Sequence, residues 1–202
     1  MLKTAKKFIL LLLGVSSLSF ATPAQVIIIR HGEKPTVGNT LSAPGYQRAA
    51  ALAAFFQTNP QVLRFGVPYA IFAQKQKNDD NSIRPIETIT PLAQALGLSV
   101  HTPFVRQDFK QLVDLILKEP QYQGKMILVC WEHCEISEMT ESFGITPAPP
   151  TYPNDRFDLL YIITFPKTGT PSFCCGLQKL MIDDKITLPI ELIPFGCNSP
   201  LK

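Results

Sequence analysis

The sequence predicts an α/β protein whose central β-sheet is mainly parallel and lies between two layers of helices. Three observations predict this fold: short apolar runs rich in Ile and Val, amphipathic helical patterns, and regular alternation of the two along the chain. Nearly continuous apolar runs are typical of strands that are buried on both faces, as in a parallel sheet covered by helices. The expected strands are Val26–Ile29, Pro68–Ala73, Leu98–His101, Lys125–Trp131 and Leu159–Phe165.

Four amphipathic patterns supply the helices of the two outer layers. Their apolar stripes cover residues 49–56, 86–96, 109–117 and 136–143. Gly97 and Gly144 follow two of these stripes, where glycine commonly ends a helix. A Pro-rich connection then leads to Phe157–Leu180, which is predicted as a β-hairpin. We therefore expect one domain over residues 22–202, with an irregular C-terminal extension.

The first 21 residues have the pattern of a cleaved secretory signal peptide. A basic stretch, Lys3–Lys7, precedes the apolar run Phe8–Val15, and Ser19–Ala21 carries small residues at the first and third positions of a cleavage site. The apolar run is shorter than the roughly 20 residues that a spanning helix needs, which favours cleavage over an uncleaved membrane anchor. We expect a periplasmic or secreted protein with no stable membrane anchor after cleavage.

Composition excludes two classes of protein. With 46% hydrophobic and 17% charged residues among 202, the chain is not intrinsically disordered. The formal net charge of +3 comes from the basic residues of the predicted signal peptide, whose removal leaves basic and acidic residues equal in number. A neutral domain has no field that steers it toward nucleic acid, so no nucleic-acid partner is expected.

Cysteine usage fits an oxidising compartment. All cysteines follow the predicted signal peptide, and their odd number leaves at least one thiol unpaired: Cys130, Cys134, Cys174, Cys175 and Cys197. Cys174 and Cys175 are adjacent, too close for an ordinary bridge to each other, so Cys197 is expected to pair with one of them. Cys130 is expected to be a free, buried strand residue. No spacing is typical of a zinc site, and no metal is expected.

Basic residues gather where predicted strands end and a helix begins. Arg30 and His31 directly follow the first strand, His133 follows the fourth, and Arg84 precedes Pro85 at a helix start. Ligands of open α/β sheets bind beyond the carboxyl ends of strands, and helix N-termini favour anions. Each residue alone could be structural or merely exposed. Together they predict a small basic pocket for a phosphoryl group, whose oxygens arginine forks bind well.

The order of these motifs resembles a known family. Arg30–Gly32 after the first strand is similar to the signature of the histidine phosphatase superfamily, the phosphoglycerate-mutase-like proteins. Leu41–Ala49 resembles the family pattern Leu-[Ser/Thr]-x-x-Gly-x-x-Gln-Ala, with Arg48 directly before its alanine. Ser82–Thr88 resembles the second-arginine motif, and Val129–His133 resembles the second-histidine strand.

The resemblance covers residues 25–145 in the family order and is weak beyond them. The large acid-phosphatase branch of the family has an arginine where this chain has Lys34, and an aspartate where it has Cys134. These departures favour the small single-domain branch.

The resemblance implies a covalent mechanism without metal or cofactor. His31 would attack phosphorus and form a phosphohistidine that water then hydrolyses. Arg30, Arg84 and His133 would bind the phosphoryl oxygens and stabilise charge in the transition state. The substrate would be a phosphorylated small molecule or another phosphomonoester.

The general acid is less evident, and three carboxylates are candidates. We assign Asp108, because it opens a helix and its spacing from the second arginine resembles that of the family's acid. Asp108 could instead cap its helix together with Gln111. Glu132 adjoins His133 on a predicted strand, so the two side chains should point to opposite faces. Glu135 lies in a first helical turn, where the helix dipole alone explains a carboxylate.

The leading hypothesis is an exported phosphatase. The alternative on the same fold is a catalytically weak or inactive protein that binds a phosphorylated ligand. A third hypothesis is a secreted interaction protein that uses the Pro-rich segment and the C-terminal hairpin as its surface.

Overall fold

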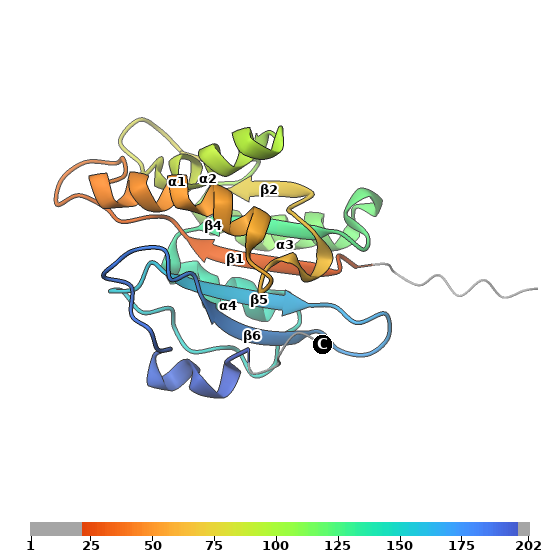
Figure 1. Ribbon diagram of the computed structural model, residues 1–202. Helices are drawn as coiled ribbons and strands as arrows, with labels where there is room; N and C mark the ends of the chain where they lie inside the picture. Colours follow the sequence, from red (N-terminus) through yellow and green to blue (C-terminus); the bar gives the residue numbers. More distant parts are fainter. Residues whose placement is uncertain (1–21, 198–202) are drawn as a thin grey trace, which may run out of the picture.

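A six-stranded sheet runs through the protein, with the strand order β3-β2-β4-β1-β5-β6 (Figure 1). The computed structural model describes residues 22–197, so the predicted signal peptide lies outside the described residues. The strands are β1 (Gln25–Arg30), β2 (Ala70–Ala73), β3 (Val100–His101), β4 (Met126–Trp131), β5 (Leu159–Thr164) and β6 (Ser172–Leu177). Strands β1 to β4 are parallel, and β5 runs antiparallel to β1 and to β6. The predicted mainly parallel sheet is confirmed.

Four α-helices cover the two faces of the sheet. They are α1 (Ala43–Thr58), α2 (Arg84–Leu96), α3 (Phe109–Lys118) and α4 (His133–Ser142). Helices α1 and α2 lie over one face, where Leu52 and Ile89 share a buried core with Ile27 of β1 (Figure 1). Helices α3 and α4 cover the other face, where Ile116 packs in a core with Ile28 of β1. The side chains of successive β1 residues thus lie in two hydrophobic cores, one on each face of the sheet, which confirms the three-layer α/β/α architecture.

The ends of the elements follow local chemistry. The Ser42 hydroxyl accepts a hydrogen bond from the Gly45 amide at 3.3 Å and caps the start of α1. The glycines after α2 and α4 have positive φ, 66° at Gly97 and 94° at Gly144, which confirms the expected helix ends. The second strand starts two residues later than expected, after Pro68, which cannot donate to a ladder.

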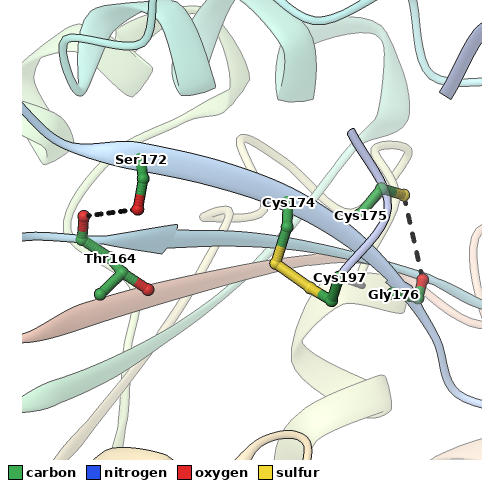
Figure 2. Close-up of a disulfide and its surroundings, with 6 residues drawn as sticks. All are labelled: Thr164, Ser172, Cys174, Cys175, Gly176 and Cys197. Carbon is green, nitrogen blue, oxygen red and sulfur yellow. Dashed lines mark hydrogen bonds between the residues drawn. A yellow bond between two sulfur atoms is a disulfide. The ribbon is translucent and has the colours of Figure 1, made fainter. Parts of the chain in front are cut away.

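The chain after α4 builds the far edge of the sheet and an irregular extension. Strands β5 and β6 form the predicted hairpin, and a 3-10 helix, Ile190–Phe195, follows β6. A disulfide joins Cys174 in β6 to Cys197 with a Cα–Cα distance of 5.1 Å (Figure 2). The Cys197 amide donates to the Cys175 carbonyl. Pairing of Cys197 with one of the two adjacent cysteines is confirmed, as is a free, buried Cys130.

The parallel arrangement gathers the predicted site residues at one edge. Strands β1, β2 and β4 end on the same side of the sheet, and β5 points the opposite way (Figure 1). Arg30 ends β1, and His133 begins α4 one residue after β4. The connection before β5 also ends at this edge, as the contacts below show. Among residues 22–197, no helix is both long and apolar enough to cross a membrane.

Candidate active site

The ring of His31 is held in one tautomer by the backbone. Its side chain is buried, and its Nδ1 atom lies 2.6 Å from the carbonyl oxygen of Gly32. A carbonyl oxygen can only accept a hydrogen bond, so Nδ1 carries the ring proton. The lone pair of the neutral ring therefore lies on Nε2, the atom that the predicted nucleophile would use.

The surroundings of His31 keep this ring neutral. Burial is the largest influence and lowers its pKa to about 3, although the bond to the Gly32 carbonyl acts to raise it. The positive charges of Arg30, Arg84 and His133 lower this pKa further. The three predicted phosphate-binding residues are thus all close enough to act on the predicted nucleophile.

Arg30 is a buried arginine whose guanidinium faces carbonyl oxygens. Its Nη1 atom donates to the carbonyls of Asn154 and Arg156, each at 2.8 Å, and to that of Pro153 at 3.4 Å. The guanidinium carbon lies 3.9 Å from the centre of the Phe157 ring, in a cation–π contact. The buried Nε atom has no hydrogen-bond partner within residues 22–197. Such an unpaired buried donor is what an arginine that binds an anion presents.

His133 also carries an unpaired ring nitrogen. Its Nε2 atom is hydrogen-bonded to the side-chain oxygen of Asn154, while the buried Nδ1 atom has no partner in the described part of the chain. Burial lowers its pKa, and the charge of Arg30 lowers it further. With the Asn154 oxygen as acceptor, Nε2 holds one proton. A phosphate at Nδ1 would favour the doubly protonated ring, which donates from both nitrogens.

Arg84 links α2 to the loop before α1. Its Nε atom donates to the Thr40 carbonyl at 2.9 Å, and its Nη2 atom donates to the Gly38 carbonyl at 2.6 Å. The Thr88 hydroxyl donates to the Arg84 carbonyl at 2.7 Å and accepts from the Gly32 amide at 2.8 Å. Thr88 therefore links the loop that carries His31 to the helix that carries Arg84.

Two glycines let α1 start directly on the loop that carries His31. A Cβ atom on Gly45 would run into the carbonyl oxygen of Glu33 and lie 3.0 Å from its amide nitrogen. A Cβ atom on Gly32 would lie 3.0 Å from the Gly45 carbonyl oxygen. Both contacts are with backbone atoms, which cannot move aside cheaply. The glycines of the two sequence motifs are thus explained by this close approach.

The acid candidates lie in two different settings. Glu132 precedes α4 and lies 3.8 Å from Arg106, and the Glu135 carboxylate accepts from the same arginine at 2.7 Å. We expected the side chains of Glu132 and His133 to point to opposite faces because both residues were predicted to lie on a strand. Strand β4 ends at Trp131 and His133 is already helical, so that premise was wrong. The Glu132 charge acts on the pKa values of both Arg30 and His133.

Asp108 precedes α3 and remains apart from these contacts. Its side chain makes no capping hydrogen bond, so the alternative in which it caps its helix together with Gln111 is wrong. The backbone at Asp108 has φ −91° and ψ 19°, because a 3-10 turn runs directly into α3, and an N-cap residue is usually extended. The structure brings together His31, Arg30, Arg84 and His133, whereas it records no hydrogen bond or ion pair from the Asp108 side chain to residues 22–197.

Three contributors to the site were missed by sequence reasoning. Thr88 stood in the second-arginine motif as a polar residue on a buried helix face, which was a usable signal. Asn154 and Phe157 lie beyond the region of resemblance, in an irregular segment where no pattern marked them. Within residues 22–197, no group of three or more His, Cys, Asp or Glu side chains could hold a metal ion.

Comparison with known proteins relates the fold to characterised enzymes. No protein-family model matches the chain, and no curated protein matches it in sequence. Its structure is similar to a phosphoglycerate mutase from Bacillus anthracis, with 10% identity, a TM-score of 0.52 and coverage of 77% of this chain and 93% of the other. It is also similar to the protein histidine phosphatase SixA complexed with tungstate, with 14% identity, a TM-score of 0.52 and coverage of 76% and 97%.

A third similar structure is the phosphoserine phosphatase from Entamoeba histolytica in complex with 3-phosphoglyceric acid, with 15% identity, a TM-score of 0.50 and coverage of 74% and 94%. All three proteins belong to the histidine phosphatase superfamily. The chain therefore has the phosphoglycerate-mutase-like fold of that superfamily. This confirms the fold that the sequence resemblance implied.

The lowered pKa of His31 can be tested directly. Ring resonances of His31 should not titrate between about pH 5 and about pH 8, because the ring stays neutral there and gains its second proton only near pH 3. NMR of protein labelled at histidine, with the His31→Gln variant to assign the signal, measures this. Titration of His31 near the ordinary value of about 6.5 would contradict the described environment.

Proposed function

We propose that the protein is an exported phosphatase that hydrolyses phosphomonoesters through a phosphohistidine at His31. The observation that carries the proposal is the neutral, buried His31 ring, whose Nε2 lone pair is free while Nδ1 bonds to Gly32. Arg30, Arg84 and His133, which all act on the same ring, supply a setting suited to a phosphoryl group.

The proposed reaction has two displacements at phosphorus. In the first, Nε2 of His31 forms a bond to phosphorus while the bond to the ester oxygen breaks in line, and Asp108, the proposed acid, gives that oxygen a proton. In the second, water attacks phosphorus and gives a proton to the Asp108 carboxylate, the bond to Nε2 breaks, and inorganic phosphate leaves. The unpaired Nε of Arg30 and Nδ1 of His133 would donate to the equatorial oxygens in both steps. Arg84 would add charge from the start of α2.

The similar structures support a phosphate-bearing ligand. The phosphoserine phosphatase structure contains 3-phosphoglyceric acid, and the SixA structure contains tungstate, an anion with the tetrahedral shape of phosphate. We infer from this likeness and from the basic site that the substrate carries a phosphoryl group. The substrate's remaining part is left open.

Two features support export. The first is the signal-peptide pattern of residues 1–21. The second is the bond between Cys174 and Cys197, since such bonds persist in oxidising compartments. We propose a periplasmic or secreted location on these grounds.

One observation favours the alternative of a ligand-binding protein with weak or no activity. Arg106 engages Glu132 and Glu135, and the Asp108 side chain makes no hydrogen bond or ion pair within residues 22–197, so among the described residues none of the three acid candidates is bonded to the basic residues of the site. A protein without an acid would bind phosphate and release a poor leaving group very slowly.

The mature protein should release phosphate from a nitrophenyl phosphate, and His31→Gln should abolish this turnover. Glutamine keeps the approximate volume of the side chain but has no nucleophilic nitrogen. Thermal unfolding should show that the variant is folded, and the chelator EDTA should leave wild-type turnover unchanged. Residual turnover within about tenfold of wild type, about 1.4 kcal/mol of barrier, would remove His31 from the mechanism. Tight binding of phosphate without any turnover would establish the alternative.

The proposed acid, Asp108, can be tested through leaving groups. Asp108→Asn should slow an alkyl phosphate by roughly 10²–10⁴-fold and scarcely affect a nitrophenyl phosphate, whose leaving group needs no proton. Glu132→Gln serves as the matched control, because it changes the carboxylate nearest to His133 in sequence in the same way. If only Glu132→Gln discriminates between the two substrates, Asp108 is not the acid and Glu132 is.

A further inference from the structure

Arg48 is a buried arginine in the middle of α1, and the mechanism above does not use it. It directly precedes the alanine of the motif Leu41–Ala49, and its side chain is 2% exposed. It bonds to Glu33 in the nucleophile's loop, to Gln178 after β6, and to Asp184 in the C-terminal extension. We call these four residues the Arg48 cluster. The cluster joins three distant parts of the chain through one guanidinium.

The first branch of the cluster leads to His31. The Glu33 carboxylate accepts from Arg48 Nε at 3.0 Å and from Nη2 at 2.6 Å. The Glu33 carbonyl accepts from the amide of Ser42 at 2.9 Å and from its hydroxyl at 3.1 Å. The carbonyl of Gly32, which holds Nδ1 of His31, belongs to the peptide unit that ends at the Glu33 nitrogen. Holding Glu33 therefore fixes the acceptor that sets the nucleophile's tautomer.

The second branch leads to Arg30. The Gln178 side-chain oxygen accepts from Arg48 Nη1 at 3.1 Å, and its nitrogen donates to the Phe157 carbonyl at 3.3 Å. The Phe157 ring packs against the Arg30 guanidinium at 3.9 Å and lies 6.0 Å from the His31 ring, between centres. Gln178 thus holds the backbone of the residue on which Arg30 rests.

The third branch leads to the C-terminal extension. Asp184 accepts from Arg48 Nη2 at 2.6 Å and Nη1 at 3.2 Å, and from the amides of Leu180 and Met181 at 2.7 Å and 3.0 Å. Its burial acts to raise its pKa, but the bonds from Arg48 and from these amides outweigh burial and lower it. The Asp184 carboxylate therefore stabilises the turn at residues 180–184 and also forms an ion pair with Arg48.

Gln178 and Asp184 both lie in the loop that the disulfide closes. This loop runs from Cys174 to Cys197, whose sequence separation is 23 residues, and Figure 2 shows the bond tying the end of the extension to β6. The bond limits how far Asp184 can move from α1. Without Asp184, the buried Arg48 charge would keep only one carboxylate partner, Glu33, which is a costly arrangement inside a protein.

We propose that Arg48 is a positioning residue through which the disulfide-closed C-terminal loop sets the geometry of the phosphate pocket. The proposal rests on the proposed phosphatase function. Asp184 and Glu33 both bind the Arg48 guanidinium. Through Glu33, Arg48 fixes the peptide whose carbonyl bonds to His31. Through Gln178, Arg48 fixes the backbone of Phe157, whose ring packs against Arg30. The extension thereby acts on both the nucleophile and an anion-binding group without touching substrate.

The test replaces Asp184 and compares a neighbouring carboxylate. Asp184→Asn should lower kcat for a nitrophenyl phosphate by roughly 10- to 100-fold and change KM less than threefold, because a misplaced nucleophile weakens the transition state most. Asp183→Asn is the matched control, since Asp183 is exposed and forms no bond among the described residues. It should leave kcat and KM unchanged.

A second readout does not depend on turnover. In the wild type, the Nδ1 proton of His31 should give a downfield NMR signal that exchanges slowly, because the proton is buried against the Gly32 carbonyl. Asp184→Asn should broaden or lose this signal while the protein remains folded, and Asp183→Asn should keep it. If wild-type protein shows no turnover at all, the proposed function fails, and this signal still tests the role of the cluster.

The disulfide gives an independent variant in case Asp184→Asn does not fold. The double variant Cys174→Ser, Cys197→Ser should lower kcat by a similar factor and lose the same His31 signal. If both changes act through Arg48, combining them should cost little more than either alone. A folded Asp184→Asn or disulfide variant with kcat within twofold of wild type and an intact His31 signal would overturn the proposal.

Discussion

The hydrogen bond from His31 Nδ1 to the Gly32 carbonyl is the interaction on which the site depends. It places the ring proton on the inner nitrogen and leaves Nε2 free at the edge where β1 ends. The peptide that supplies this carbonyl is held from several sides. Thr88 accepts from the Gly32 amide, α1 packs on the loop through Gly45, and Arg48 holds the Glu33 side chain. A rigid acceptor is the condition for a nucleophile in one fixed tautomer.

The cations of the site are arranged by carbonyl oxygens rather than by acids. The guanidinium groups of Arg30 and Arg84 both donate hydrogen bonds to backbone carbonyl oxygens. These bonds fix the orientation of each guanidinium, and because a carbonyl is uncharged they do not neutralise its positive charge. Carboxylates nearby are engaged elsewhere, as in the ion pairs of Arg106 with Glu132 and Glu135. Net positive charge therefore remains around His31, where it lowers the ring's affinity for a second proton and favours a phosphoryl anion.

Sequence reasoning found the features that local patterns encode. Apolar runs gave the strands, glycines gave the helix ends, and strand-end residues gave His31, Arg30 and His133, because parallel strands bring their carboxyl ends to one edge. It missed partners that only long-range packing creates. Asn154 beside His133 lies in an irregular segment, and Arg48 finds Asp184 far along the chain. The cap that was the alternative for Asp108 is absent, because a 3-10 turn leads into α3 there.

The most direct test of this account asks where a phosphoryl group attaches during turnover. Protein mixed with a nitrophenyl phosphate and quenched in alkali, where phosphohistidine survives, can be digested and mapped by mass spectrometry. The account predicts a phosphoryl group on the peptide that contains His31, stable in alkali and lost in acid, and absent from the His31→Gln variant. Turnover that leaves no phosphoryl group on His31, or places one on His133 instead, would contradict the account.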